Sequence, residues 1–375
     1  MRIVYVTRRW TVHDRRFVQG LLGAGHEVVY RAVERLPEAA LREMRQNRVL
    51  SARDWRAAGA SFWPRLPWMV RDLRRLVREF QPDLIHAGPI QQGAFVAALA
   101  GFHPLASMSW GSDLLRDARA GRDRWLASFV LRRSNVLVCD CETVRARAID
   151  LGMDPERICV FPWGVELDVF SPTAKSEIRR SLGWEGCLVL MSARPWEPVY
   201  GTHLVAEAFA TAAASEADLR LLMLGEGSQR RRIRRRLESG EAIRRTHFPG
   251  PVEHAGLPAY FRAADLYLSA SRSDGSSVTL LEAMASGLPA LVSDIPSNRE
   301  WVEDGANGWT FRDGDPASLA GAILRAAQDR GRLGAMGRAA RAVTEARADW
   351  SKNFPRLDQA YRMAQHHSMT RPNGG

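Results

Sequence analysis

The chain has few cysteines, and this scarcity limits the kinds of structure that it can form. Four cysteines in 375 residues cannot supply a disulfide framework for a chain of this length. Cys139 and Cys141 alternate along an apolar stretch, so we expect buried, reduced thiols and a cytoplasmic protein. No His/Cys pair with zinc spacing lies near these two cysteines, so we expect no metal site there.

Long apolar segments are also absent. The apolar start at residues 1–7 is too short for a signal peptide, and no run approaches the roughly 18–20 residues that span a bilayer. If the protein meets a membrane, we therefore expect it to lie on the surface, at the inner face, and not to cross.

Lysine is nearly missing, because Lys175 and Lys352 are the only two in the chain. Arginine nevertheless gives a formal charge of +11 and a pI near 10.3, which favours an anionic partner such as nucleotide phosphates, anionic lipid or nucleic acid. No nucleic-acid reader motif is present, so we expect no nucleic-acid partner. No Gly-x-Gly-x-x-Gly follows the first predicted strand, which argues against a nicotinamide-dependent dehydrogenase.

Residues 264–311 carry the strongest functional pattern. Residues 265–270 predict a buried strand, a polar loop follows, and residues 277–286 predict a helix that Gly287 ends. Residues 288–292 predict a second strand, so the unit is typical of a parallel α/β sheet. Ligands of such sheets bind beyond the carboxyl ends of the strands, where loop amides and a helix N-terminus attract anions. Asp274 and Glu282 lie at that end, with seven residues between them.

Each of these carboxylates also has an ordinary structural explanation. Thr279-x-x-Glu282 is a capping box, in which Glu282 would only satisfy the first turn of the helix. Asp274-Gly275 is a common turn dipeptide. Their spacing, together with the run that follows Glu282, is much harder to obtain by chance than either feature alone.

The run Glu-Ala-Met-Ala-Ser-Gly-Leu-Pro at residues 282–289 resembles the signature of the retaining glycosyltransferases of family 4. Their pattern is Glu, seven residues, then Glu-Ala-Met-Ala-x-Gly-x-Pro, and Asp274 replaces the first glutamate here. The resemblance implies an α/β protein with the GT-B fold: two Rossmann-like, doubly wound domains facing across a cleft, with a C-terminal helix crossing back to the first domain. It also implies that Glu282 binds the nucleotide ribose and that Asp274 lies near the sugar hydroxyls.

The resemblance extends to the rest of the donor-binding half. Relatives place an arginine and, six residues later, a lysine on the donor diphosphate; Arg194 matches the arginine, whereas Tyr200 stands where the lysine is expected. Tyr200 could donate one hydrogen bond. Gly225 belongs to a Gly-Glu-Gly loop after a predicted strand, and Val252 is a candidate contact of the base. No Asp-x-Asp motif suits the site, so we expect Arg194 and loop amides, without a metal or cofactor, to neutralise the diphosphate; the loop residues are Gly275, Ser276, Ser277, Val278 and Thr279.

The first half departs more from the family, and its candidates concern the acceptor side. His13 lies in a predicted polar loop (residues 10–16) where many relatives carry a Gly-Gly pair, and His86 ends a predicted strand. Trp110 replaces the histidine of a His-Gly-x-Asp pattern, while Asp113 keeps its aspartate. Asp113 could bind an acceptor hydroxyl or cap the following helix.

The domain layout follows from the same comparison. We expect an acceptor-side domain over residues 1–165, completed by a C-terminal helix at about 350–365, and a donor-binding domain over residues 170–348. The final predicted helix covers residues 350–363, and residues 366–375 have no periodicity, which predicts a disordered tail.

Residues 55–80 combine arginine with Trp55, Trp63 and Trp68, and residues 69–80 predict an amphipathic helix. A packed helix with a solvated basic face is the favoured interpretation. The alternative is peripheral membrane contact, since basic residues beside exposed aromatic residues bind anionic interfaces.

These observations predict a retaining glycosyltransferase of the hexosyltransferase type that uses a nucleotide-sugar donor. UDP-sugars and GDP-mannose are the commonest donors in the family, and the acceptor is unidentified. The alternative is a catalytically degenerate GT-B protein that binds a nucleotide or glycan, because Tyr200 and Trp110 both replace residues that relatives use.

Overall fold

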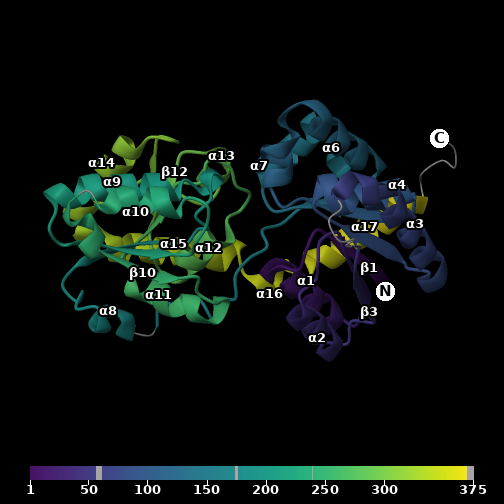
Figure 1. Cartoon of the computed structure of the whole chain (residues 1–375), viewed down its shortest axis with the longest axis horizontal. Helices are drawn as coiled ribbons and strands as arrows, with labels where there is room; N and C mark the ends of the chain where they lie inside the picture. The colour runs from purple at the N-terminus through teal and green to yellow at the C-terminus, as the bar shows by residue number, and fades with distance from the viewer. Residues whose placement is uncertain (56–60, 174–175, 239, 370–375) are drawn as a thin grey trace. The chain divides into compact units, whose positions relative to one another are not determined.

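The computed structural model describes residues 1–55, 61–173, 176–238 and 240–369. The chain divides into two compact units (Figure 1). The first unit comprises Met1–Phe161 together with the chain from Phe354 onward, and the second comprises Pro162–Asn353. Each unit is built on its own parallel sheet.

The sheet of the first unit has the order β3-β2-β1-β4-β5-β6-β7 within the described residues, and all of its neighbouring strands are parallel. Its middle strands are buried along their whole length, as expected when helices cover both faces of a parallel sheet. The strands are β1 (Arg2–Thr7), β2 (Glu27–Ala32), β3 (Ser51–Asp54), β4 (Leu84–Ala87), β5 (Leu105–Met108), β6 (Val136–Cys139) and β7 (Ile158–Val160).

Helices connect these strands and complete the first unit. They are α1 (Val12–Gly23), α2 (Glu38–Gln46), α3 (Phe62–Phe80), α4 (Phe95–Ala100), α5 (Ser112–Leu115), α6 (Gly121–Arg133), α7 (Glu142–Asp150) and α17 (Arg356–Met369). The prediction of a polar loop at residues 10–16 is wrong, because α1 begins at Val12. Thr11 and Asp14 form a reciprocal capping box there, which satisfies the first amides of the helix.

Helix α3 starts earlier than predicted, at Phe62, and includes both Trp63 and Trp68. Each of these indoles is 39% exposed, whereas Trp55 is fully buried and donates from Nε1 to Asp72 at 2.7 Å. Trp55 is therefore a core residue and does not belong to an exposed aromatic surface. The part of the 55–80 region at residues 56–60 lies outside the described residues.

The end of the chain packs in the first unit. The predicted helix at 350–363 is two helices, α16 (Trp350–Asn353) and α17, which are separated at Pro355. Tyr361 on α17 contacts His86, and Asp358 contacts His26 at 3.0 Å. Helix α17 continues through Met369, so residues 366–369 are helical and not part of a disordered tail; residues 370–375 lie outside the described residues.

The sheet of the second unit has the order β10-β9-β8-β11-β12-β13 in the part of the chain that the structure describes, again all parallel. The strands are β8 (Leu188–Ser192), β9 (Leu219–Leu224), β10 (Thr246–Gly250), β11 (Leu266–Ser269), β12 (Ala290–Ser293) and β13 (Gly308–Phe311). The helices are α8 (Glu177–Ser181), α9 (Thr202–Ser215), α10 (Arg230–Glu238), α11 (Leu257–Ala263), α12 (Val278–Ala285), α13 (Pro296–Arg299), α14 (Pro316–Gln328), α15 (Leu333–Arg347) and α16.

The side chains of β8 alternate between two hydrophobic cores, one on each face of this sheet. Leu188 and Leu190 join the core beneath α9, α10 and α14, while Val189 and Met191 join the core beneath α11 and α12 (Figure 1). Successive side chains of a strand point to opposite faces, so a strand that is apolar throughout needs helices on both sides. The carboxyl ends of the strands are left for the polar loops.

No helix in the described part of the chain combines the length and the apolar character that crossing a bilayer requires.

Candidate active site

The loops that follow β8 and β11 bring Arg194 and Asp274 into direct contact. Arg194 lies two residues beyond β8, and its Nη2 is 2.5 Å from Oδ2 of Asp274. Its Nη1 donates to Oγ of Ser277 at 2.8 Å and approaches Oγ1 of Thr279 at 3.5 Å. Three of the predicted donor-binding side chains are thus gathered around one guanidinium group.

Arg194 is buried, with 7% of the residue exposed, whereas Asp274 is half-buried. Burial raises the pKa of Asp274, while the charge of Arg194 and the amide of Gly275 act in the opposite direction. Burial by itself would lower the pKa of Arg194, but Asp274, together with the smaller effects of neighbouring groups, raises that pKa above its ordinary value, so the guanidinium stays cationic. Its Nε is buried and has no hydrogen-bond partner among the described residues, which leaves one donor unused.

Tyr200 supports the same guanidinium through its ring. Cζ of Arg194 lies 4.2 Å from the ring centroid, a distance typical of a cation–π contact. Gly201, which follows, has φ +58°, and a Cβ there would come within 2.1 Å of the carbonyl oxygen of Ala270. Only glycine fits at this point, so the turn that presents Tyr200 lies tightly against the end of β11.

Helix α12 points its N-terminus into this group of residues. It starts at Val278, with Ser277 as its N-cap accepting from the amide of Leu280 at 3.4 Å. Ser276 is also buried, and its Oγ accepts from Nε1 of Trp301 at 3.1 Å. The positive end of the helix dipole and the free amides of its first turn favour an anion here. The remaining predicted loop residues line the same turn: Gly275 is buried, and Val278 and Thr279 are half-buried.

Glu282 lies on α12 and is 4% exposed. Its Oε1 is 2.8 Å from Nε2 of His254, which belongs to a short 3-10 turn (His254–Gly256). The capping-box interpretation of Thr279 and Glu282 is therefore wrong, because the N-cap is Ser277 and the Glu282 carboxylate contacts a residue 28 positions away. His254 was not predicted from the sequence, although it lies two residues after the predicted base contact Val252.

Gly225 and Val252 line the neighbouring loops. Gly225 has φ +96°, and a Cβ there would lie 3.2 Å from the carbonyl oxygen of Arg194, so the Gly-Glu-Gly loop packs closely on the Arg194 loop. Nε1 of the buried Trp196 donates to the carbonyl oxygen of Leu224 at 3.0 Å and fixes that contact. Val252 is half-buried and packs on the core that contains Phe170.

In the first unit, the structure brings together His13 and Trp110. Their rings are 5.7 Å apart, and Trp110 also contacts Phe17 on α1. His86 is buried, stacked on Tyr5 at 4.6 Å and with Nδ1 2.6 Å from the hydroxyl of Tyr361. Burial lowers the pKa of His86 to about 3, so its ring is neutral.

Asp113 is 4% exposed and organises the loop after β5. One carboxylate oxygen accepts from the amide of Ile90 at 3.0 Å, and the other accepts from Oγ of Ser109 at 2.7 Å and from the amides of Trp110 and Leu114, each at 3.1 Å. Burial raises the pKa of Asp113, and these hydrogen bonds oppose that effect. The observed contacts of Asp113 thus connect the loops that follow β4 and β5.

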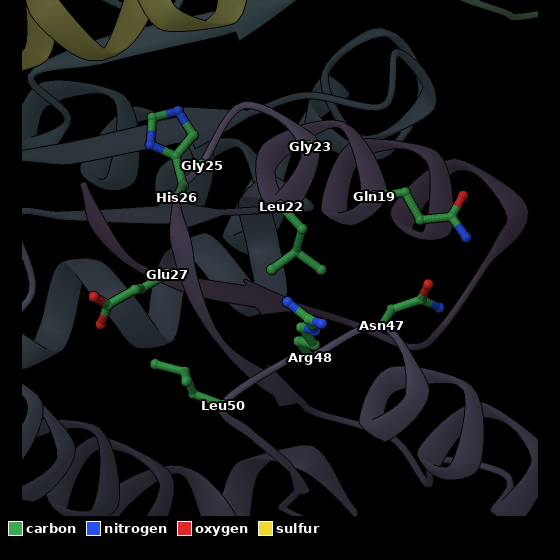
Figure 2. A pocket seen from close by; sticks show the side chains of 9 residues that line it. All are labelled: Gln19, Leu22, Gly23, Gly25, His26, Glu27, Asn47, Arg48 and Leu50. Carbon is green, nitrogen blue, oxygen red and sulfur yellow. The ribbon is translucent and has the colours of Figure 1, made fainter.

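A surface hollow of about 440 Å³ lies elsewhere, where α1 and α2 end and β2 begins (Figure 2). Its lining includes His26, Arg48 and Leu50, and none of the candidate site residues contributes to it. It opens at the amino ends of the strands, away from the loops that carry the candidates of this unit. Within the described residues, no group of three or more His, Cys, Asp or Glu side chains is placed to hold a metal ion.

Comparison with known proteins assigns the chain to a family. The family model for glycosyl transferases group 1 matches residues 174–343, and the model for glycosyltransferase family 4 matches residues 11–169. D-inositol 3-phosphate glycosyltransferase of Acidothermus cellulolyticus is 30% identical over 208 residues, which are 52% of this chain and 46% of that protein. Phosphatidyl-myo-inositol mannosyltransferase of Mycobacterium leprae is 32% identical over 175 residues, 46% of this chain and 44% of that protein. This chain thus matches about half the length of these curated relatives.

A solved structure resembles the whole chain. The crystal structure of Anabaena HepE in complex with UDP matches with a TM-score of 0.80 at 18% identity, covering 96% of this chain and 100% of the other. Because the two family models together match nearly the whole chain, this protein belongs to the group 1, family 4 glycosyltransferases, and it has their GT-B fold.

Proposed function

We propose that this protein transfers a sugar from a nucleoside-diphosphate sugar to an acceptor, with retention of the anomeric configuration. The observation that carries the proposal is the guanidinium of Arg194, held at the N-terminus of α12 between Asp274 and Ser277. A buried cation beside free helix amides is suited to a diphosphate, the group that leaves in such a transfer.

Residues of the second unit are available for each part of the nucleotide-sugar donor: the diphosphate, the sugar, the ribose and the base. The unused Nε–H of Arg194 and the first amides of α12 contact the diphosphate, while Asp274 accepts from sugar hydroxyls. Glu282 accepts from the ribose hydroxyls, and Val252 contacts the base. Before the donor binds, Arg194 and His254 partner the two carboxylates, so neither is left as an isolated buried charge.

The chemical step requires charge stabilisation more than a protein nucleophile. The bond between the anomeric carbon and the diphosphate oxygen breaks, and the acceptor oxygen attacks the same face of the sugar. The acceptor proton passes to a departing phosphate oxygen, so atoms and charge balance without a metal or cofactor. Arg194 and the α12 amides stabilise the charge that develops on the diphosphate.

The donor and acceptor are best searched for among a few candidates. HepE was solved with UDP, and GDP-mannose is the other donor that the family resemblance suggests. Two relatives are named for D-inositol 3-phosphate and for phosphatidyl-myo-inositol, so these two compounds are the first acceptors to test.

A binding protein without transferase activity is the second candidate. Tyr200 favours it, because the ring supports Arg194 but adds no second positive charge for the diphosphate. The two candidates share the donor site and differ in turnover.

The experiment combines binding with turnover. Melting temperature is measured with UDP, GDP, ADP, UDP-glucose, UDP-N-acetylglucosamine and GDP-mannose, and a ligand at about 100 times its Kd adds about 2.7 kcal/mol to the free energy of unfolding. Glu282→Ala should abolish the shift, while Glu185→Ala, an exposed glutamate of the same unit, should keep it. Release of the nucleoside diphosphate is then followed with the acceptors.

The outcomes separate the candidates. A shift selective for one base, lost in Glu282→Ala and accompanied by turnover, supports the transferase. A shift without turnover for any donor or acceptor favours the binding protein. No shift with any nucleotide contradicts both.

A further inference from the structure

A continuous aromatic surface lies on the first unit, where the first turn of α3 meets α6. Trp63 contacts Phe95 with ring centroids 6.1 Å apart, Phe95 contacts Phe129 at 5.7 Å, and Phe129 stacks on Trp125 at 5.5 Å. Phe95 is buried beneath, whereas Trp63 is 39% and Trp125 57% exposed. Two exposed indoles from separate helices are thus connected through the rings of Phe95 and Phe129.

Arginines cover the same surface, and we refer to these four aromatic residues with their two arginines as the aromatic–arginine surface. Cζ of Arg122 lies 4.7 Å from the ring of Trp63, and Cζ of Arg133 lies 4.8 Å from the ring of Phe129. Arg122 is also 3.6 Å from Asp123. Helix α6 has a net positive charge, because it carries one acidic residue, Asp123, and four arginines: Arg122, Arg124, Arg132 and Arg133.

This combination is unusual for a surface that meets only water. Exposed tryptophan keeps a large apolar area in contact with solvent, and contiguous exposed apolar area commonly marks a binding surface. The indole ring is amphipathic and partitions to the boundary between lipid headgroups and acyl chains, while arginine binds anionic headgroups. The positive charge of the arginines also disfavours a second copy of this surface as the partner, because pairing two copies would bring like charges together.

We propose that the aromatic–arginine surface binds the headgroup region of an anionic lipid bilayer, with Trp63 and Trp125 entering the interface. The arginines remain at the level of the phosphates, and the first unit rests on the membrane without crossing it. The donor site lies in the second unit, so this inference stands independently of the proposed function.

The test measures co-sedimentation of the full chain with vesicles. Phosphatidylcholine vesicles are compared with vesicles that contain about one third phosphatidylglycerol, and the wild type should bind only the latter. Arg122→Gln with Arg133→Gln should weaken binding by about 25-fold, at about fivefold for each cation near an anionic leaflet. Trp63→Ala with Trp125→Ala should also weaken it severalfold. Added salt should weaken the wild-type binding, because exposed charges are screened.

Trp68 provides a matched control. It is as exposed as Trp63 and lies on the same helix, but five residues further on, which turns it by about 140° around α3 at 3.6 residues per turn. Trp68→Ala should therefore keep vesicle binding. Unchanged melting temperatures show that each variant is folded.

A second measurement locates the contact directly. The four cysteines are all buried, so Trp125→Cys introduces an accessible thiol for an environment-sensitive fluorophore. Its emission should shift to the blue with phosphatidylglycerol vesicles and not with phosphatidylcholine alone, whereas the same label at Trp68→Cys should not shift.

Three outcomes would overturn the inference. They are an absence of binding to the anionic vesicles, an equal loss of binding in Trp68→Ala and the double tryptophan variant, and wild-type self-association without lipid that the tryptophan substitutions abolish. The last would make the surface an interface between copies of this chain.

Discussion

Tyr200 occupies the position where relatives are expected to carry a lysine, and its ring lies against the guanidinium of Arg194. Two roles were open for this residue: a hydrogen bond from its hydroxyl, or no role in donor binding. The structure adds a third, in which the ring holds Arg194 in place while Asp274 balances its charge. Such a contact is stronger in a desolvated site than at the surface.

Two substitutions separate the ring from the hydroxyl. Tyr200→Phe keeps the ring and should leave the Kd for the bound nucleoside diphosphate within about twofold. Tyr200→Leu removes a cation–π contact of about 1–2 kcal/mol and should raise that Kd by about 5- to 30-fold. Isothermal titration calorimetry measures both. If Tyr200→Phe weakens binding as much as Tyr200→Leu does, the hydroxyl is the group that matters.

Single residues of the site differ in how far sequence could predict them. Asp274, Glu282 and Arg194 were predicted from motifs at strand ends together with the family resemblance, and the structure brings Arg194 and Asp274 together. His254 was missed because its partner Glu282 lies 28 residues away and no local pattern connects the two. Trp55 was grouped with exposed aromatic residues in the membrane-contact alternative, whereas it is buried in the core of the first unit and donates to Asp72, a tertiary contact that no local pattern signals.

At the scale of elements, α1 begins with a buried carboxylate. Asp14 accepts hydrogen bonds from Thr7 at 3.0 Å, from the hydroxyl of Tyr5 at 3.4 Å and from the amide of Thr11 at 3.0 Å. Burial raises the pKa of Asp14 from its ordinary 3.8 to about 6, and these hydrogen bonds limit the rise. Burial, and not the hydrogen bonds of the helix cap, therefore makes the ionised form of Asp14 unfavourable in the folded chain.

The stability of the first unit should depend on pH through this residue. Because the folded chain holds the Asp14 proton more tightly than the unfolded chain, the contribution is fully present below about pH 4 and is lost as the pH rises through about 6. The wild type should therefore lose about 2 kcal/mol relative to Asp14→Asn between pH 4 and pH 7. Urea denaturation of both proteins at each pH measures this difference. A constant difference would show that Asp14 does not titrate in this range.

The elements that sequence could predict are the apolar ones. The strand, helix and strand at residues 265–292 occur close to their predicted bounds, because each is an apolar segment with a clear end signal. Strand β3 was not predicted, since Ser51–Asp54 is a short, polar edge strand without apolar alternation. The start of α1 was missed although Thr11-x-x-Asp14 could have signalled it, because the capping pattern is usually read with Glu or Gln.

At the scale of the whole molecule, the second unit is one continuous segment, Pro162–Asn353, and it contains the entire candidate donor site. Both of its sheet faces are covered by its own helices. The first unit is discontinuous, because α17 supplies partners to His26 and His86 from the far end of the chain.

Residues 162–353 expressed alone should therefore fold and bind nucleotide. A unit with its own core can fold independently, and its Kd for the nucleoside diphosphate should stay within about threefold of that of the full chain. Residues 1–161 alone should melt at a lower temperature than the first unit of the full chain, because buried polar atoms left without partners cost about 1–3 kcal/mol each. Calorimetry and thermal melting measure both fragments. An unfolded 162–353 fragment would contradict this expectation.

The return of α17 to the first unit has a consequence for synthesis on the ribosome. Translation proceeds at about 5–20 residues per second, so roughly 10–40 seconds separate the emergence of residue 161 from that of Tyr361. During this interval the second unit can finish folding, whereas the first unit cannot yet form the contact between His86 and Tyr361. The part of the protein that is made first is thus the last to be completed.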